Sequence, residues 1–160
     1  IQMPMQSAFI GWKQEPDDYL EHILGHDRLE KLNPIRTFRD NNIVVSFGSD
    51  APCTTPDPIA WMDRAVNNDN AGQAVSVQDA LRMCTYNGAW AAFDEQERGS
   101  LEAGKIADMA VLSENPYTVP KDKLSGLRVE RLYLSGKSYE SCRESILPMM
   151  LRGLTSRNKA

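Results

Sequence analysis

The chain has 160 residues and a formal net charge of −4, and 25% of its residues are charged. This length is sufficient for one domain with its own hydrophobic core. No basic run could neutralise phosphate groups, which argues against a nucleic-acid partner. No apolar stretch approaches the roughly 20 residues that span a bilayer, and no signal peptide is evident. We therefore expect a cytoplasmic protein without a membrane partner.

Cysteine usage favours the same compartment. The three cysteines, Cys53, Cys84 and Cys142, form neither a CxxC pair nor a pairable spacing, and a sparse, odd count is typical of reducing conditions. Cys53 lies close to Asp50 in the sequence, so an acyl-transfer enzyme with a thiol nucleophile is one hypothesis. A passive thiol is the favoured interpretation, because a nucleophilic cysteine would need a histidine to activate it.

One strand and two helices are predicted before residue 43. Met5–Ile10 is the candidate strand. A helix is predicted to begin at Pro16 and to end near Gly25, since proline suits the first turn and glycine the exit. A second helix should follow Asn33, acting as its N-cap, and end near Asn41.

The stretch "IVVSFGSDAP" contains the strongest strand signal. Ile43–Phe47, bounded by glycine and proline, is typical of a strand buried on both faces of a parallel sheet. Asp50 follows its carboxyl end, the place where (β/α) barrels hold catalytic residues. The residue pattern by itself leaves two interpretations open at equal weight: Asp50 caps the next turn, or it is a catalytic carboxylate.

Two capped helices are predicted next. Asp57 is an N-cap with Pro58 in the first helical position, and apolar residues recur after it at helical spacing. Ser76 and Asp79 form a capping box that opens a further helix. We expect this helix to be interrupted at Asn87-Gly88.

After residue 98 the sequence pattern changes from helices to short strands joined by turns. "GSLEAGKIADMAVL" (residues 99–112) predicts two short strands joined by a turn at residues 103–105. "VERLYLSGKSYE" (residues 129–140) predicts a second hairpin that turns at residues 135–137. A terminal helix is predicted over residues 146–154.

The two histidines, His22 and His26, are four residues apart in "EHILGH". This is not the H-E-x-x-H zinc motif, because the glutamate precedes both histidines and Gly25 separates them. An exposed helix surface is the favoured interpretation.

Four segments in this order resemble the C-terminal end of the amidohydrolase superfamily: "FGSDAP", "SVQDALRMCTYNGAWAAF", "GSLEAGKIADMAVL" and "LYLSGKSYE". The branch they resemble is amidohydrolase family 3, the metal-dependent hydrolases similar to N-acyl amino acid deacylases. The likeness covers roughly residues 6–140.

The resemblance implies an α/β fold: the last βα units of a TIM-like (β/α)8 barrel, followed by strands of a small β-sandwich. Residues 1–98 would be the barrel part, residues 99–142 the sandwich strands, and residues 143–160 a C-terminal helix and tail. The barrel is incomplete within these residues, so we expect a fragment that lacks its N-terminal part. An incomplete sheet also favours a homo-oligomer.

The resemblance also implies a chemistry. The family hydrolyses a carbon–nitrogen bond of a small-molecule amide or cyclic amide, and Asp50 matches the proton shuttle and metal ligand. The divalent metal would be zinc in the full-length enzyme, and we expect none on this chain alone, which should be inactive in isolation. Trp12, Ser49 and Pro52 are predicted to contact substrate.

Two further hypotheses concern the same residues. The alternative to the enzyme is a non-catalytic regulatory or assembly module that keeps only the C-terminal part of the fold. In "G-K-x-A-D", Lys105 and Asp108 are interpreted as structural, with Asp108 forming hydrogen bonds to the backbone.

Overall fold

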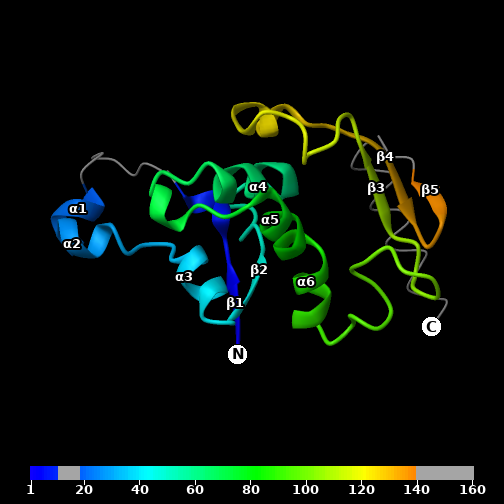
Figure 1. Ribbon diagram of the computed structural model, residues 1–160, viewed down its shortest axis with the longest axis horizontal. Helices are drawn as coiled ribbons and strands as arrows, with labels where there is room; N and C mark the ends of the chain where they lie inside the picture. Colours follow the sequence, from blue (N-terminus) through cyan, green and yellow to red (C-terminus); the bar gives the residue numbers. More distant parts are fainter. Residues whose placement is uncertain (11–18, 140–160) are drawn as a thin grey trace, which may run out of the picture.

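The computed structural model describes residues 1–10 and 19–139. It has an α/β part around a two-stranded parallel sheet and, beside it, a three-stranded antiparallel sheet (Figure 1). Trp12, Cys142 and the terminal helix predicted over residues 146–154 lie outside the described residues. In the described part of the chain, no helix has the length and apolar character needed to cross a membrane.

The parallel sheet consists of β1 (Gln2–Met5) and β2 (Val44–Phe47). The strand predicted over Ile43–Phe47 is confirmed to within one residue. The strand predicted over Met5–Ile10 is wrong: β1 ends at Met5, and Ser7–Phe9 form a 3₁₀ turn, η1.

The turn η1 forms because its polar groups find partners that a strand would not provide. The Ser7 side chain is buried, and its hydroxyl donates to the Trp61 carbonyl at 3.0 Å. The Ile10 amide donates back to the Ser7 carbonyl at 3.0 Å. A buried hydroxyl is costly without such a partner, so this contact ends the strand and ties the segment to the helix that carries Trp61.

Six α-helices are described, and Gly25, in the left-handed region at φ 74°, separates the first two as predicted. Figure 1 shows that the first two lie far from the sheet, whereas α3, α5 and α6 contact β2. The helices are α1 (Tyr19–Leu24), α2 (His26–Leu29), α3 (Ile35–Asp40), α4 (Pro58–Val66), α5 (Val77–Cys84) and α6 (Tyr86–Ala91).

Two of the three predicted N-caps are confirmed. The Asp57 side chain accepts from the Ile59 amide at 3.0 Å, and Ser76 with Asp79 forms the predicted capping box. The cap predicted at Asn33 is wrong, because Pro34 is the N-cap of α3 and no side chain caps that helix.

The interruption of the long helix is also displaced from its predicted position. It falls at Thr85 (φ −123°, ψ −92°), between α5 and α6, and not at Asn87-Gly88. The Thr85 hydroxyl donates to the Leu81 carbonyl at 2.8 Å. Asn87 stays inside α6, where its side chain bonds another element.

The hydrophobic core lies between the parallel sheet and helices α3 to α5, and it also receives residues from the segment that links two strands of the antiparallel sheet. That segment contains the 3₁₀ helix η3 (Lys121–Gly126), and it runs back over α4 before it returns to the antiparallel sheet (Figure 1). The most buried members are Ile35, Val45, Met62, Ala65, Ala80 and Leu124.

Leu124 and Leu127 join the core of the α/β part although both fall within residues 99–142. The segment that links two strands of the antiparallel sheet therefore packs into the core of the α/β part. The division at residue 98 stays a prediction.

The antiparallel sheet has the order β3 (Met109–Leu112), β4 (Val129–Leu134) and β5 (Lys137–Tyr139). The hairpin with its turn near Gly136 is confirmed. The hairpin predicted within residues 99–112 is wrong, because only its second strand forms and that strand pairs with β4.

Residues 99–108 are held by local bonds instead of strand pairing. The Ile106 amide donates to the Glu97 carbonyl at 2.7 Å, and the Lys105 ammonium donates to the Ser100 hydroxyl at 2.6 Å. The Ile106 amide, which belongs to the predicted second strand, is therefore not available to pair with the predicted first strand.

Gly99 is the point at which this loop meets α6. Its φ of 90° lies in the left-handed region that disfavours side chains. A Cβ atom there would lie 2.6 Å from the Ala89 Cβ and 3.1 Å from the Tyr86 Cα. The "N-G-A" and "G-S-L" segments are thus two sides of one close backbone contact.

We predict that Gly99→Ala lowers the free energy of unfolding by about 2–4 kcal/mol, because overpacking and positive φ act together. Urea denaturation followed by circular dichroism measures the effect. Gly126→Ala is the matched control, since a Cβ there meets nothing within 4 Å. Equal stability of the two variants would contradict the proposed close packing.

Candidate functional site

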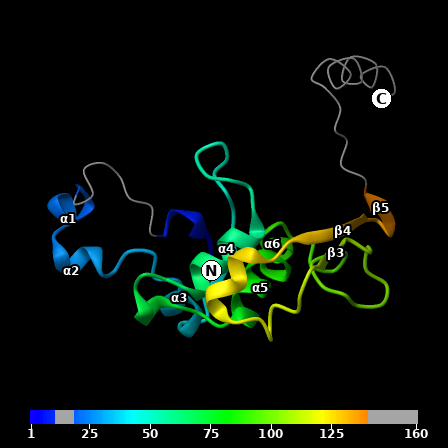
Figure 2. The same cartoon turned by 90° about the horizontal axis from the view of Figure 1, so that it is seen from above.

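The carboxyl ends of β1 and β2 meet at one edge of the parallel sheet. The last link between them is the Gly48 amide, which donates to the Met5 carbonyl at 3.0 Å. Ser49 and Asp50 then leave the sheet, and the loop up to α4 stands out from the body of the molecule (Figure 2). Residues in this loop are presented to solvent by a fixed strand end.

A tight turn orients Asp50. Its φ is 54°, its own carbonyl accepts from the Cys53 amide at 2.9 Å, and it is exposed. The Ser49 hydroxyl accepts from the Ala51 amide at 3.1 Å, and the Ser49 carbonyl accepts from the Thr54 hydroxyl. The backbone of the turn is therefore fixed by bonds that leave the Asp50 carboxylate unused.

The Asp50 carboxylate has no hydrogen bond or ion pair to any residue within 1–10 and 19–139. In particular it does not cap the turn that follows, which was one of the two interpretations of the sequence. An exposed carboxylate without a structural partner at a strand end is available to a substrate or a metal.

A cavity of about 640 Å³ lies beside this loop. Pro52 lines it, whereas Ser49 and Asp50 lie in the turn before it. The far side of the loop is held by the Trp61 indole, which donates to the Thr55 carbonyl at 3.1 Å. The lining residues are Ala8, Ala51, Pro52, Cys53, Thr54, Thr55, Pro56, Ala60 and Arg64.

The two described cysteines differ in their surroundings. Burial raises the pKa of the Cys84 thiol to about 12, and its Sγ donates to the Pro58 carbonyl, so this thiol is inert at neutral pH. Cys53 is exposed in the loop and lines the cavity. The described histidines, His22 and His26, lie on α1 and α2, away from this loop (Figure 1).

Both histidines are exposed, as the sequence predicts. His26 lies 3.4 Å from the Glu21 carboxylate and 3.5 Å from that of Glu30. Across residues 1–10 and 19–139, no three His, Cys, Asp or Glu side chains come together as a metal site. Asp50, the one predicted metal ligand, thus belongs to no such group among these residues.

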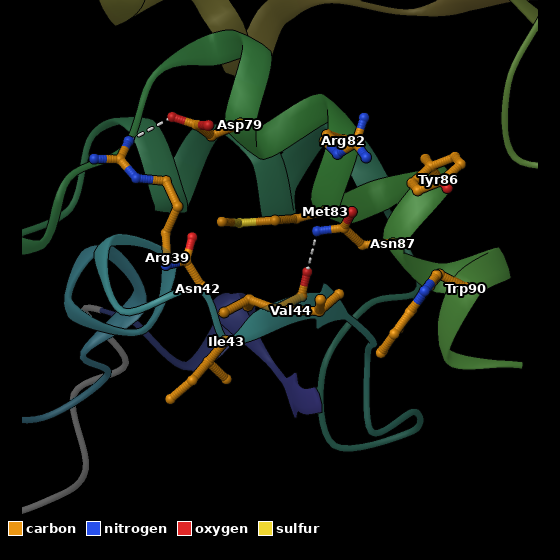
Figure 3. A pocket seen from close by; sticks show the side chains of 11 residues that line it. Arg39, Asn42, Ile43, Val44, Asp79, Arg82, Met83, Tyr86, Asn87 and Trp90 are labelled. Atoms are coloured by element: carbon orange, nitrogen blue, oxygen red, sulfur yellow. Dashed lines mark hydrogen bonds and ion pairs between the residues drawn. The ribbon is translucent and has the colours of Figure 1, made fainter. Parts of the chain in front are cut away.

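A second cavity, of about 400 Å³, opens at the other end of β2 against α5 and α6 (Figure 3). Asn87 points from α6 toward the strand, and its buried amide donates to the Val45 carbonyl at 2.7 Å. Val44 bonds β1, and alternate residues of a parallel strand face opposite edges. Asn87 therefore satisfies the edge of β2 that β1 does not pair.

Charged groups at this second cavity pair with one another. The Arg39 guanidinium lies 2.5 Å from the Asp79 carboxylate (Figure 3), and Arg82 lies over the Tyr86 ring at 4.2 Å. Burial raises the pKa of Asp79, but hydrogen bonds from Ser76 and Arg39 outweigh it and hold the pKa below its ordinary value. This network connects α3 with α5.

The "G-K-x-A-D" segment is structural, as predicted. The Asp108 carboxylate accepts from the Ser135 amide at 2.8 Å and from Arg98 at 3.2 Å. The Lys105 ammonium bonds Ser100 and lies 5.6 Å from the Tyr86 ring centre. These bonds fix the loop against both α6 and the antiparallel sheet.

The model of the amidohydrolase family matches residues 1–139. The chain belongs to the amidohydrolase family. An N-substituted formamide deformylase of Arthrobacter pascens is 36% identical over 136 residues, which cover 81% of this chain and 23% of the deformylase.

Solved structures share part of this fold. A metal-dependent hydrolase of Pyrococcus furiosus has a TM-score of 0.58 at 27% identity, over 67% of this chain and 22% of that one. A second metal-dependent hydrolase, from Pyrococcus horikoshii, has a TM-score of 0.64 at 24% identity, over 76% of this chain and 26% of that one. This amidohydrolase-family chain thus spans about a quarter of the length of its relatives.

The contacts of Asn87 and Gly99, and the position of Arg64 at the cavity, were not predicted from the sequence of this amidohydrolase-family chain. Asn87 and Gly99 were quoted as parts of motifs, and only the structure shows that they bond β2 and pack on α6. Arg64 occupies an ordinary polar position of α4, and no sequence signal separates it from other surface arginines.

We predict that Asp79→Asn lowers the free energy of unfolding at neutral pH. This difference from the unmodified protein should shrink as the pH falls through and below 3.8, the ordinary pKa of this carboxyl. The folded pKa is lower than the unfolded one, so the ionised carboxylate stabilises above that value and ceases to do so in acid. Urea unfolding at several pH values measures it, with the exposed Asp69→Asn as control. A pH-independent loss would contradict the ionic contribution.

Proposed function

We propose that this chain is the C-terminal part of a metal-dependent amidohydrolase that cleaves a carbon–nitrogen bond. In this proposal β1 and β2 are the last two strands of a TIM-like (β/α)8 barrel, and the antiparallel sheet is part of a small β-sandwich. Family membership, the deformylase relative and the parallel pairing of β1 with β2 support it. They favour the enzyme over a non-catalytic regulatory module.

The observation that carries the proposal is the unpartnered carboxylate of Asp50 at the carboxyl edge of the parallel sheet. In (β/α) barrels this edge holds the catalytic groups. Asp50 would accept a proton from the attacking water while the oxygen of that water forms a bond to the amide carbon. It would then deliver that proton to the leaving nitrogen as the C–N bond breaks, so one group acts first as base and then as acid.

The described residues do not form a metal site by themselves, because no three potential ligand side chains come together among them. A catalytic zinc ion takes about three protein ligands. In the proposal, the divalent metal, with zinc as the predicted ion, would therefore take further ligands from outside these residues. Isolated residues 1–160 would be inactive, and association into a homo-oligomer stays a prediction.

The relative's name supplies a substrate class for the test. N-substituted formamides are small amides, and a cavity of about 640 Å³ falls within the usual range for small-molecule sites. Cys53, Pro52 and Ser49 would lie near the substrate in this proposal. Trp12 remains a predicted contact outside the described residues.

We predict that Asp50→Asn, made in the longest natural protein that contains this chain, lowers kcat for N-benzylformamide by about 10²–10⁴-fold. The amide cannot take up the proton that the carboxylate accepts, while the exposed position leaves the fold unchanged. Formate release measures the rate, and circular dichroism checks folding. Asp122→Asn, an exposed acid on η3, should retain full activity.

Near-normal activity of a folded Asp50→Asn protein would remove Asp50 from the mechanism. Absence of hydrolysis by the unmodified protein across formamides and larger amides would overturn the proposed function itself.

A further inference from the structure

The cavity beside the Asp50 loop has an unusual distribution of charge. Arg64 is the one charged residue among those that line it. The remaining lining residues are small or apolar, or carry a hydroxyl or thiol, as listed above. A largely apolar cavity with one charged group is typical of a site that orients a small ligand by a single charged end.

The Arg64 guanidinium has no ion pair, hydrogen bond or ring contact to any residue in the described ranges. Arg36 pairs with Asp40 at 3.6 Å and Arg98 with Asp94 at 2.5 Å. Among the described residues Arg28, Arg128 and Arg131 form no ion pair either, and Arg64 differs from these three because it lines the cavity. The acid next to Arg64 in the sequence, Asp63, accepts instead from the Asn67 amide at 2.8 Å. The guanidinium of Arg64 is therefore free to bind an anion.

The local structure keeps Arg64 at the cavity. It lies one helical turn after Ala60 on α4, so both residues face the same side of the helix. Ala60 is small and leaves room above the helix. The Asp57 cap and the Trp61–Thr55 bond fix the first turn of α4 against the loop, so the loop and Arg64 are held in one unit.

We propose that this cavity binds an anionic end of the substrate, a carboxylate, through Arg64, and that Arg64 determines specificity. This deepens the proposed function and rests on it. A guanidinium matches a carboxylate with two parallel hydrogen bonds. The Asp50 carboxylate repels a second negative charge, so the anionic end lies at Arg64 and the scissile amide lies toward Asp50.

The test uses two probes that differ only in charge: N-benzylformamide and the same compound with a carboxylate on its ring. Calorimetry measures binding of each to the longest natural protein that contains this chain, and formate release measures turnover. Arg64→Gln removes the charge, Arg64→Lys keeps the charge without the fork, and Arg28→Gln is the control, an exposed arginine on α2 outside the cavity.

We expect Arg64→Gln to weaken binding of the carboxylate probe about 10- to 100-fold, the usual value of a charged hydrogen-bonded pair. Binding of the neutral probe should change less than about threefold, Arg64→Lys should lie between, and Arg28→Gln should behave as the unmodified protein. Circular dichroism and urea unfolding confirm that the variants fold.

Equal losses for both probes, or no binding of the carboxylate probe to the unmodified protein, would overturn the anion site. The turnover assay separates this result from the proposed function. Hydrolysis of the neutral probe with no effect of Arg64→Gln on the charged one rejects the anion site alone. Charge-dependent binding at Arg64 without hydrolysis of either probe retains the anion site and rejects the amidohydrolase.

Discussion

The structure depends on how β2 satisfies the backbone hydrogen-bonding groups on the side that faces away from β1. This strand is buried in the core through Val45, and within the described part of the chain it pairs with one neighbour, β1. A buried backbone carbonyl without a partner costs about as much as a lost hydrogen bond. The Asn87 amide fills that need for Val45 at 2.7 Å, and the bond fixes α6 against β2, the strand that leads to Asp50.

The same helix connects the strand to the antiparallel sheet. α6 presents Ala89 to Gly99, and the loop after Gly99 leads through Lys105 and Asp108 to β3. On the other side, η3 returns from β3 to bury Leu124 against the core. The close approach at Gly99 and the burial of Leu124 thereby connect the segments next to the antiparallel sheet to the α/β part.

This arrangement determines which side chains near the 49–57 loop keep unpaired charges. β2 and the caps of α4 hold the ends of the 49–57 loop, and the bonds inside the loop use backbone groups and hydroxyls. Asp50 and Arg64 are left with their charges unpaired among the described residues, at neighbouring parts of one exposed loop and helix. A chain that spans about a quarter of its relatives' length thus offers two charged groups of opposite sign and a cavity.

The sequence determined the features that local chemistry controls. The caps at Asp57 and Ser76, the strand of β2 and the hairpin at Gly136 were predicted because each depends on neighbours a few residues away. The family resemblance rested on motifs of the same kind, and it placed Asp50 at the strand end.

Tertiary structure decided the rest, because the deciding partners are distant in the chain. Ser7 ends β1 through Trp61, β3 pairs with β4 across a long excursion, Asn87 bonds Val45, and Arg64 reaches a cavity built from three segments. Burial and long-range hydrogen bonding set these contacts, and no local pattern encodes which distant group will satisfy a buried one.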